Sequence, residues 1–90
     1  MSSVPAHLGL GQALFQKKDY DSAAEHLETA TRLDSRGTKQ AFMLLAQIHV
    51  LSKRYDRARY FLKAMAEFFP NDPEVSKLSQ SLNYLSDNLP

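Results

Sequence analysis

The sequence contains no cysteine and no tryptophan, and it has only three glycines and four prolines. Without cysteine the chain can form neither a disulfide nor a cysteine-based zinc site, and the absence is consistent with a reducing compartment. The scarcity of glycine and proline, together with 43% hydrophobic and 23% charged residues, excludes the disordered and low-complexity classes. A chain of 90 residues with this composition predicts one small globular domain, residues 1–90.

Long apolar segments are also absent. No run of 18 apolar residues is present, so no transmembrane helix is expected. The first five residues lack the basic and then apolar pattern of a secretory signal. The cytoplasm is therefore the default location, unless the chain is a piece of a larger protein.

The net charge is only +1, so no field of the whole molecule attracts nucleic acid or anionic lipid. A local basic cluster does occur in the second half of the chain. Its members are Lys53, Arg54, Arg57, Arg59 and Lys63. Because the cluster comes with no groove-reading motif, we expect a solvated face or a secondary surface for an acidic protein, and nucleic acid is an unlikely partner.

The sequence repeats itself after 35 residues. Residues 6–33 aligned on residues 41–68 give eight identities, where composition alone would give roughly two. The identical pairs are Ala6/Ala41, Leu10/Leu45, Gln12/Gln47, Lys18/Lys53, Tyr20/Tyr55, Asp21/Asp56, Ala23/Ala58 and Leu27/Leu62. A period of this length predicts a stacked repeat architecture.

Apolar residues spaced three and four apart predict five helices, at about residues 4–17, 20–34, 39–52, 55–68 and 73–89. A serine cap before Pro5 predicts the first start, and Asp19 is suited to cap the second helix. Gly37 is expected to end a helix in the left-handed conformation. Asp72 and Pro73 predict a strong start for the last helix, whose apolar face is Val75, Leu78, Leu82, Leu85 and Leu89.

Helix pairs at this period resemble the tetratricopeptide repeat, whose pattern is W-x2-L-G-x2-Y, then A-x3-F, then P. The first copy reads His7-x2-Leu10-Gly11-x2-Leu14, Ala23-x3-Leu27 and Ser35; the second reads Phe42-x2-Leu45-Ala46-x2-His49, Ala58-x3-Leu62 and Pro70. The small residues Gly11, Ala23, Ala46 and Ala58 would let the helices of each pair approach closely. The resemblance implies a short all-α solenoid: repeat one at about 4–37, repeat two at about 38–72, and a capping helix at about 73–89.

In this family the first helices of successive repeats line a concave groove that binds peptides or partner helices. Carried onto this chain, the groove positions are Leu8, Gln12, Phe15, Met43, Gln47, Val50, Lys77, Ser81 and Tyr84. We expect the apolar members to contact an amphipathic or extended segment of a partner, and the two glutamines to bind its backbone. In the alternative, the last helix folds into the groove or a second copy of the chain covers it. The groove lacks the cationic set that family members use to grip a terminal carboxylate.

Tyr60, Phe61 and Phe69 predict either a second contact surface or packing under the capping helix. No catalytic site is expected. Gly9 and Gly11 fall inside a predicted helix with no preceding strand, so they do not form a phosphate loop. The three histidines are far apart in the sequence, and packed or surface roles explain them better than metal ligation.

The sequence thus predicts a protein-binding module, an adaptor or chaperone-like scaffold without enzymatic activity, cofactor, metal or membrane insertion. The alternative is a structural or self-associating subunit, such as a homodimer, or a slice of a longer solenoid. Two repeats are fewer than the three or so that usually give stability, so either the cap suffices or another chain completes the stack.

Overall fold

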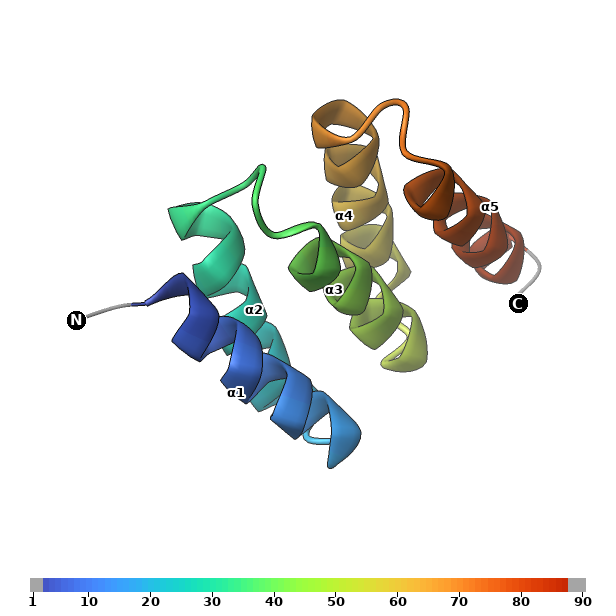
Figure 1. The fold of residues 1–90 in the computed structure, drawn as a ribbon. Coiled ribbons are helices and arrows are strands. Elements are labelled where there is room, and N and C mark those ends of the chain that lie inside the picture. Colours follow the sequence, from blue (N-terminus) through green and yellow to red (C-terminus); the bar gives the residue numbers. More distant parts are fainter. Residues whose placement is uncertain (1–2, 88–90) are drawn as a thin grey trace.

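The computed structural model describes residues 3–87, which form five helices joined by short connections (Figure 1). The helices are α1 (Val4–Gln16), α2 (Tyr20–Leu33), α3 (Lys39–Leu51), α4 (Tyr55–Phe68) and α5 (Pro73–Asp87). Each agrees with its predicted range within two residues, and no strand occurs in residues 3–87, so the all-α fold class is confirmed. The predicted extension to residue 89, and with it Leu89, lies outside the described residues, as does the side chain of Leu85.

Two helix starts are capped by side chains. Ser3 Oγ accepts from the Ala6 nitrogen at 3.4 Å, and Asp72 Oδ1 accepts from the nitrogens of Glu74 and Val75 at 2.9 and 3.2 Å. The prediction that Asp19 caps α2 with its side chain is wrong, because no such hydrogen bond forms. The Asp19 backbone nitrogen instead donates to the Leu14 carbonyl at 2.9 Å and so helps to end α1.

The corner inside each repeat is built in the same way. Lys18 and Lys53 have φ angles of 65° and 61°, in the left-handed region that L-residues seldom adopt. The Lys18 nitrogen donates to the Phe15 carbonyl at 3.0 Å, and the Lys53 nitrogen donates to the Val50 carbonyl at the same distance. With the bond from the following residue, this is the Schellman arrangement that satisfies the last carbonyls of a helix. Each repeat therefore turns its corner on a lysine where glycine is the usual residue.

The connection between the repeats depends on Gly37 for a different reason from the predicted one. No glycine in residues 3–87 has a positive φ, so the expected left-handed conformation of Gly37 is wrong. Its nitrogen donates to Asp34 Oδ1 at 3.0 Å, and a Cβ at this position would lie 2.1 Å from the other carboxylate oxygen. A larger residue at position 37 would therefore displace the exposed Asp34 carboxylate from this position.

Small residues bring the helices of a pair together. A Cβ at Gly11 on α1 would lie 2.6 Å from Cγ and Cδ2 of Leu27 on α2, and Leu27 is fully buried. Ala23 is also fully buried, as are its repeat counterpart Ala58 on α4 and Ala46 on α3. The predicted close approach within each pair is confirmed.

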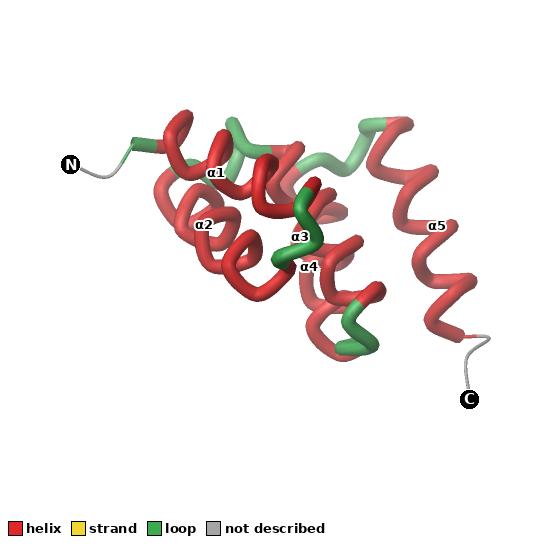
Figure 2. The backbone as a smooth tube through the Cα atoms, turned by 90° about the horizontal axis from the view of Figure 1, so that it is seen from below, coloured by secondary structure: helices red, strands yellow, loops and turns green. Residues whose placement is uncertain are grey.

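Helix α3 lies at the centre of the stack (Figures 1 and 2). Among the described residues it packs against all four other helices, which explains its apolar composition. Its buried residues are Ala41, Phe42, Met43, Leu44, Leu45, Ala46, Ile48 and His49. Within residues 3–87, α2 does not contact α4, and α1 does not contact α5.

Helix α5 packs on α3 and α4, in the place where the first helix of a further repeat would lie (Figure 1). Because it does not reach α1, the structure does not support the alternative in which the last helix folds back along the whole groove.

Candidate functional site

Helix α1 supplies the first three predicted groove residues. Leu8 and Phe15 are half-buried and pack against the core, and Gln12 is exposed. The Phe15 ring lies 5.7 Å from the ring of Tyr20, the first residue of α2. Helix α1 therefore presents an apolar strip, anchored at one end by an aromatic contact, with an accessible amide beside it.

Helix α3 supplies less groove surface than the sequence suggests. Gln47 and Val50 are half-buried, but Met43 is 8% exposed and belongs to the core. The reason is the central position of α3, which leaves few of its side chains uncovered. Met43 is therefore a core residue with almost no surface for a partner, contrary to the prediction that it lines a groove.

Helix α5 presents the last three predicted residues to solvent. Lys77 and Ser81 are exposed, and Tyr84 is 68% exposed. Since α3 lies between α5 and α1, α5 is at the opposite end of the stack from α1 (Figure 2). A partner that contacts both ends must span three helices.

A cleft of about 260 Å³ opens between α1 and α3. Its lining residues are Gln12, Phe15, Gln16, Gln40 and Leu44. Two of them, Gln12 and Phe15, were predicted from the sequence. The other three combine two further amides with a leucine that is only 7% exposed.

Sequence reasoning missed Gln40 and Leu44 because it treated equivalent positions of the two repeats as equivalent surfaces. In a stack, the edge of α3 that meets α1 is not the edge that meets α5. The spacing of four residues between Gln40 and Leu44, and between Gln12 and Gln16, is the signal that each pair shares one helix edge.

The basic cluster divides into two groups. Arg54, just before α4, pairs with Asp21 on α2 and lowers the pKa of that carboxyl. Arg57 lies close enough to His49 for its positive charge to lower the pKa of the imidazole. Arg59 and Lys63 line a separate cleft between α4 and α5, and Arg59 also pairs with Asp56 at 3.6 Å. The fifth member, Lys53, is exposed at the corner before α4. The five cations therefore do not form one continuous patch.

The structure brings together two histidines that are far apart in the sequence. His7 on α1 and His26 on α2 are half-buried, with their Nδ1 atoms 3.0 Å apart and their ring centroids 5.3 Å apart. One ring donates to the other, and the tautomers decide which. No group of three or more potential metal ligands occurs in residues 3–87, so the pair stands as a contact between helices.

His49 is fully buried on α3, and its ring lies parallel to that of Phe61 on α4. Neither ring nitrogen has a hydrogen-bond partner. Burial, reinforced by the positive charges of Arg54 and Arg57, lowers the pKa of His49 from 6.5 to about 4, although Asp21 acts in the opposite direction. His49 is therefore a neutral, packed side chain at pH 7, as expected.

The aromatic residues of α4 have separate roles. Phe61 is 6% exposed and packs between His49 and Phe42, and Phe69 is half-buried with its ring 6.2 Å from that of Phe42. Tyr60 is 68% exposed. Phe61 and Phe69 thus pack within the fold, and Tyr60 alone of the three is left mainly to solvent.

Two helix pairs with close internal packing, stacked through a central helix and followed by a helix in the next stacking position, define a short α-solenoid. A family model for the tetratricopeptide repeat matches residues 8–73. The chain belongs to the tetratricopeptide repeat family, as its resemblance implied. No curated protein and no solved structure matches the chain significantly. None of the helices described for residues 3–87 combines the length and hydropathy that a bilayer span requires.

Proposed function

We propose that this chain is a protein-protein interaction module, an adaptor or chaperone-like scaffold, which holds a helix or an extended segment of a partner along α1, α3 and α5. Tetratricopeptide repeats are generally non-catalytic scaffolds for protein binding, and repeat arrays use extended concave surfaces. In this proposal the two repeats and α5 act as a single domain.

The observation that carries the proposal is the chemistry of the α1–α3 cleft. Its lining combines the apolar side chains of Phe15 and Leu44 with the side-chain amides of Gln12, Gln16 and Gln40. Within residues 3–87 these three amides make no hydrogen bond, so their donors and acceptors are available. An apolar pocket with convergent amides suits one side chain and the adjoining backbone of a bound segment.

The cleft has room for one or two side chains, so it serves as an anchor. Leu8 and Val50 extend the apolar strip beyond it, and Gln47 offers a further amide. The exposed residues of α5 complete the surface at the far end. They are Lys77, Ser81 and Tyr84.

The proposal can be tested with peptides selected from a random display library on the immobilised full chain. Their affinities are then measured by fluorescence anisotropy for the wild type and for Gln16→Arg, which fills the cleft mouth from an exposed position in the last turn of α1. Arginine suits a helix C-terminus, so the fold is retained. We expect at least a tenfold loss of affinity.

Glu25→Arg is the control, because Glu25 is exposed on α2, which supplies none of the proposed binding surface. It is expected to bind the selected peptides as the wild type does. If Gln16→Arg kept full affinity for every selected peptide, the anchor would lie elsewhere.

Self-association is the second candidate, and one pair of residues favours it. Leu45 on α3 is fully buried, whereas its repeat counterpart Leu10 on α1 is 50% exposed. In α3 the preceding repeat supplies the cover, since α3 packs against both α1 and α2. Another repeat, or a second copy of the chain, would cover Leu10 in the same way.

Sedimentation velocity at micromolar concentrations separates the two functions. A dimer that Leu10→Glu converts to monomer would support self-association. A wild type that is monomeric at all these concentrations would rule it out and leave the peptide-binding proposal unaffected.

A further inference from the structure

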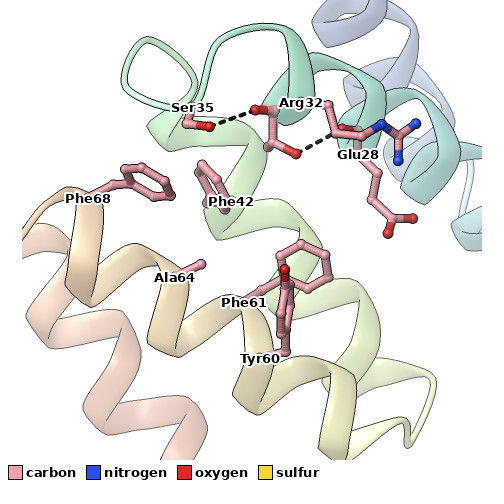
Figure 3. Close-up of a pocket in the computed structure, with 9 residues that line it drawn as sticks. Glu28, Arg32, Ser35, Phe42, Tyr60, Phe61, Ala64 and Phe68 are labelled. Atoms are coloured by element: carbon pink, nitrogen blue, oxygen red, sulfur yellow. Dashed lines mark hydrogen bonds between the residues drawn. The ribbon is translucent and has the colours of Figure 1, made fainter.

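A second cleft lies between α2 and α4 (Figure 3). Among the described residues these two helices do not pack against each other, although Arg54 just before α4 pairs with Asp21 on α2, and a space of about 310 Å³ remains between them. Its lining residues are Glu28, Thr31, Arg32, Ser35, Phe42, Tyr60, Phe61, Ala64 and Phe68. Its two walls differ in chemistry.

One wall is aromatic. The ring of Tyr60 lies 5.1 Å from that of Phe61, Phe61 lies 6.4 Å from Phe42, and Phe42 lies 5.7 Å from Phe68. Phe42 and Phe61 are buried and fixed by the core, whereas Tyr60 is 68% and Phe68 39% exposed. The buried rings therefore support two accessible ones, and packing within the fold does not explain the exposure of Tyr60.

The opposite wall, on α2, consists mainly of hydrogen-bond acceptors. The Thr31 hydroxyl donates to the Glu28 carbonyl at 2.8 Å, and the Ser35 hydroxyl donates to the Thr31 carbonyl at 3.0 Å (Figure 3). Each hydroxyl has used its one proton, so each oxygen can only accept from a ligand.

The charged groups of this wall reinforce its character. The Glu28 carboxylate forms no ion pair within residues 3–87. Arg32, the one cation that lines the cleft, donates from Nη2 to Thr29 Oγ1 at 3.3 Å. A ligand in the cleft thus meets aromatic rings on one side. On the other it meets two acceptor hydroxyls, the Arg32 side chain and a carboxylate that forms no ion pair among the described residues.

We propose that the α2–α4 cleft binds an arginine side chain of a partner protein, with the guanidinium placed between the Tyr60 ring and the Glu28 carboxylate. Guanidinium is planar, stacks on aromatic rings and carries five donors but no acceptor, so it complements both walls at once. An apolar side chain would desolvate the acceptors without replacing their hydrogen bonds, and an acidic one would meet Glu28. This site is separate from the α1–α3 groove and does not depend on it.

The test is a titration of the full chain with a short arginine peptide, monitored through the amide chemical shifts in NMR spectra of the protein. The probe is the blocked peptide acetyl-Gly-Gly-Arg-Gly-Gly-amide, and matched peptides carry citrulline, lysine or leucine in place of arginine. Citrulline keeps the shape of arginine and removes its charge. We expect saturable shifts confined to residues 28–35 and 60–68, a Kd of about 1–10 mM, and at least fivefold weaker binding of the other three peptides.

Variants with matched controls locate the site. Tyr60→Ala and Glu28→Gln should each weaken the arginine peptide at least threefold. Leu51→Ala removes an exposed apolar side chain from the end of α3, and Glu25→Gln neutralises an exposed carboxylate of α2. Neither residue lines the cleft, so both variants should leave binding unchanged. All four positions are at least partly exposed, so the spectra should remain those of the folded chain.

Three results would overturn the proposal. The first is the absence of saturable shifts up to about 20 mM arginine peptide, a concentration above the Kd expected for one side chain. The second is equal binding of the citrulline, lysine or leucine peptide, since each would show that the guanidinium is not what the cleft recognises. The third is unchanged binding by Tyr60→Ala and Glu28→Gln.

Discussion

The imidazole of His49 lies parallel to the phenyl ring of Phe61, with the centroids 5.4 Å apart and an angle of 6° between the rings. The contact joins the two helices of the second repeat at a point where the imidazole has no hydrogen-bond partner. Burial of the neutral form makes the stability of the fold depend on pH, because a protonated His49 would be a buried charge.

We predict that acid destabilises the fold through His49. Its pKa is 6.5 when unfolded and about 4 when folded, so the unfolded chain binds more protons between these values. The stability that the neutral ring provides is fully present above about pH 6.5 and is lost as the pH falls to about 4, by up to about 3 kcal/mol. Urea denaturation at pH 7 and pH 4.5 measures the difference.

His49→Leu is the control for this prediction, since leucine occupies the equivalent position 14 in the first repeat. The variant should be at least as stable as the wild type at pH 7, because it removes two unpaired nitrogens from the core. It should also lose most of the difference between the two pH values. If the difference persisted in full, its source would be groups other than His49.

Two glycines of α1 should respond in opposite ways to alanine. At Gly9 an added Cβ meets no atom within 4 Å, so Gly9→Ala gains about 1 kcal/mol of helix propensity. At Gly11 the same gain is outweighed by the contact with buried Leu27, since overpacking costs about 1–3 kcal/mol, and we expect a net loss of about 1 kcal/mol. Urea denaturation of both variants under one condition provides the measurement. Equal stabilities would show that α1 can shift away from α2 at no cost.

The left-handed lysines predict two stabilising substitutions. Lys18→Gly and Lys53→Gly remove the steric penalty of a positive φ, and each should raise the free energy of unfolding by about 0.5–1 kcal/mol. Lys17→Gly is the control next in the chain, because Lys17 has an ordinary φ of −81° and glycine there should destabilise. Thermal denaturation of the three variants and the wild type compares their stabilities. A loss of stability in both corner variants would mean that the lysine side chains make contributions larger than the backbone strain.

Asp72 should stabilise the first turn of α5. Its carboxylate caps the helix and pairs with Lys39 Nζ at 2.9 Å, and these contacts lower its pKa. Asp72→Ala removes both interactions, and we expect the first-turn amides of α5 to exchange with solvent at least fivefold faster. Asp72→Asn keeps a capping oxygen but loses the ion pair, so it should stay close to the wild type. Equal exchange in the two variants would assign the effect to the ion pair.

The cap becomes weaker only as the pH falls toward the lowered pKa of Asp72.

The helices and their pairing could be predicted because the residues that recur after 35 positions include those that close packing requires. Ala23 and Ala58 are both fully buried, and Leu27 and Leu62 are both in the core. The same pattern could not show how the pairs stack, because stacking makes equivalent residues unequal. Leu10 and Leu45 are identical in sequence, but one is half exposed and the other is buried.

The candidate sites were less predictable for the same reason. Gln12 and Phe15 could be placed in the groove, but the contribution of Leu44 and the burial of Met43 depend on which edge of α3 meets α1. The cleft beside Tyr60 results from the separation of α2 and α4, which no local pattern encodes.

The central position of α3 has a consequence for folding. In residues 3–87, the first helix pair packs on the remaining helices through α3, and the Asp21–Arg54 ion pair adds one link to the start of α4. A partly folded chain in which α3 is open would consist of one isolated hairpin and two helices with little cover, so such an intermediate should be sparsely populated. The α3 amides should therefore exchange only when the whole chain unfolds, while α1 and α5 open separately from either end. Despite its repeated sequence, the chain would then be most stable at its middle helix and least stable at its two ends.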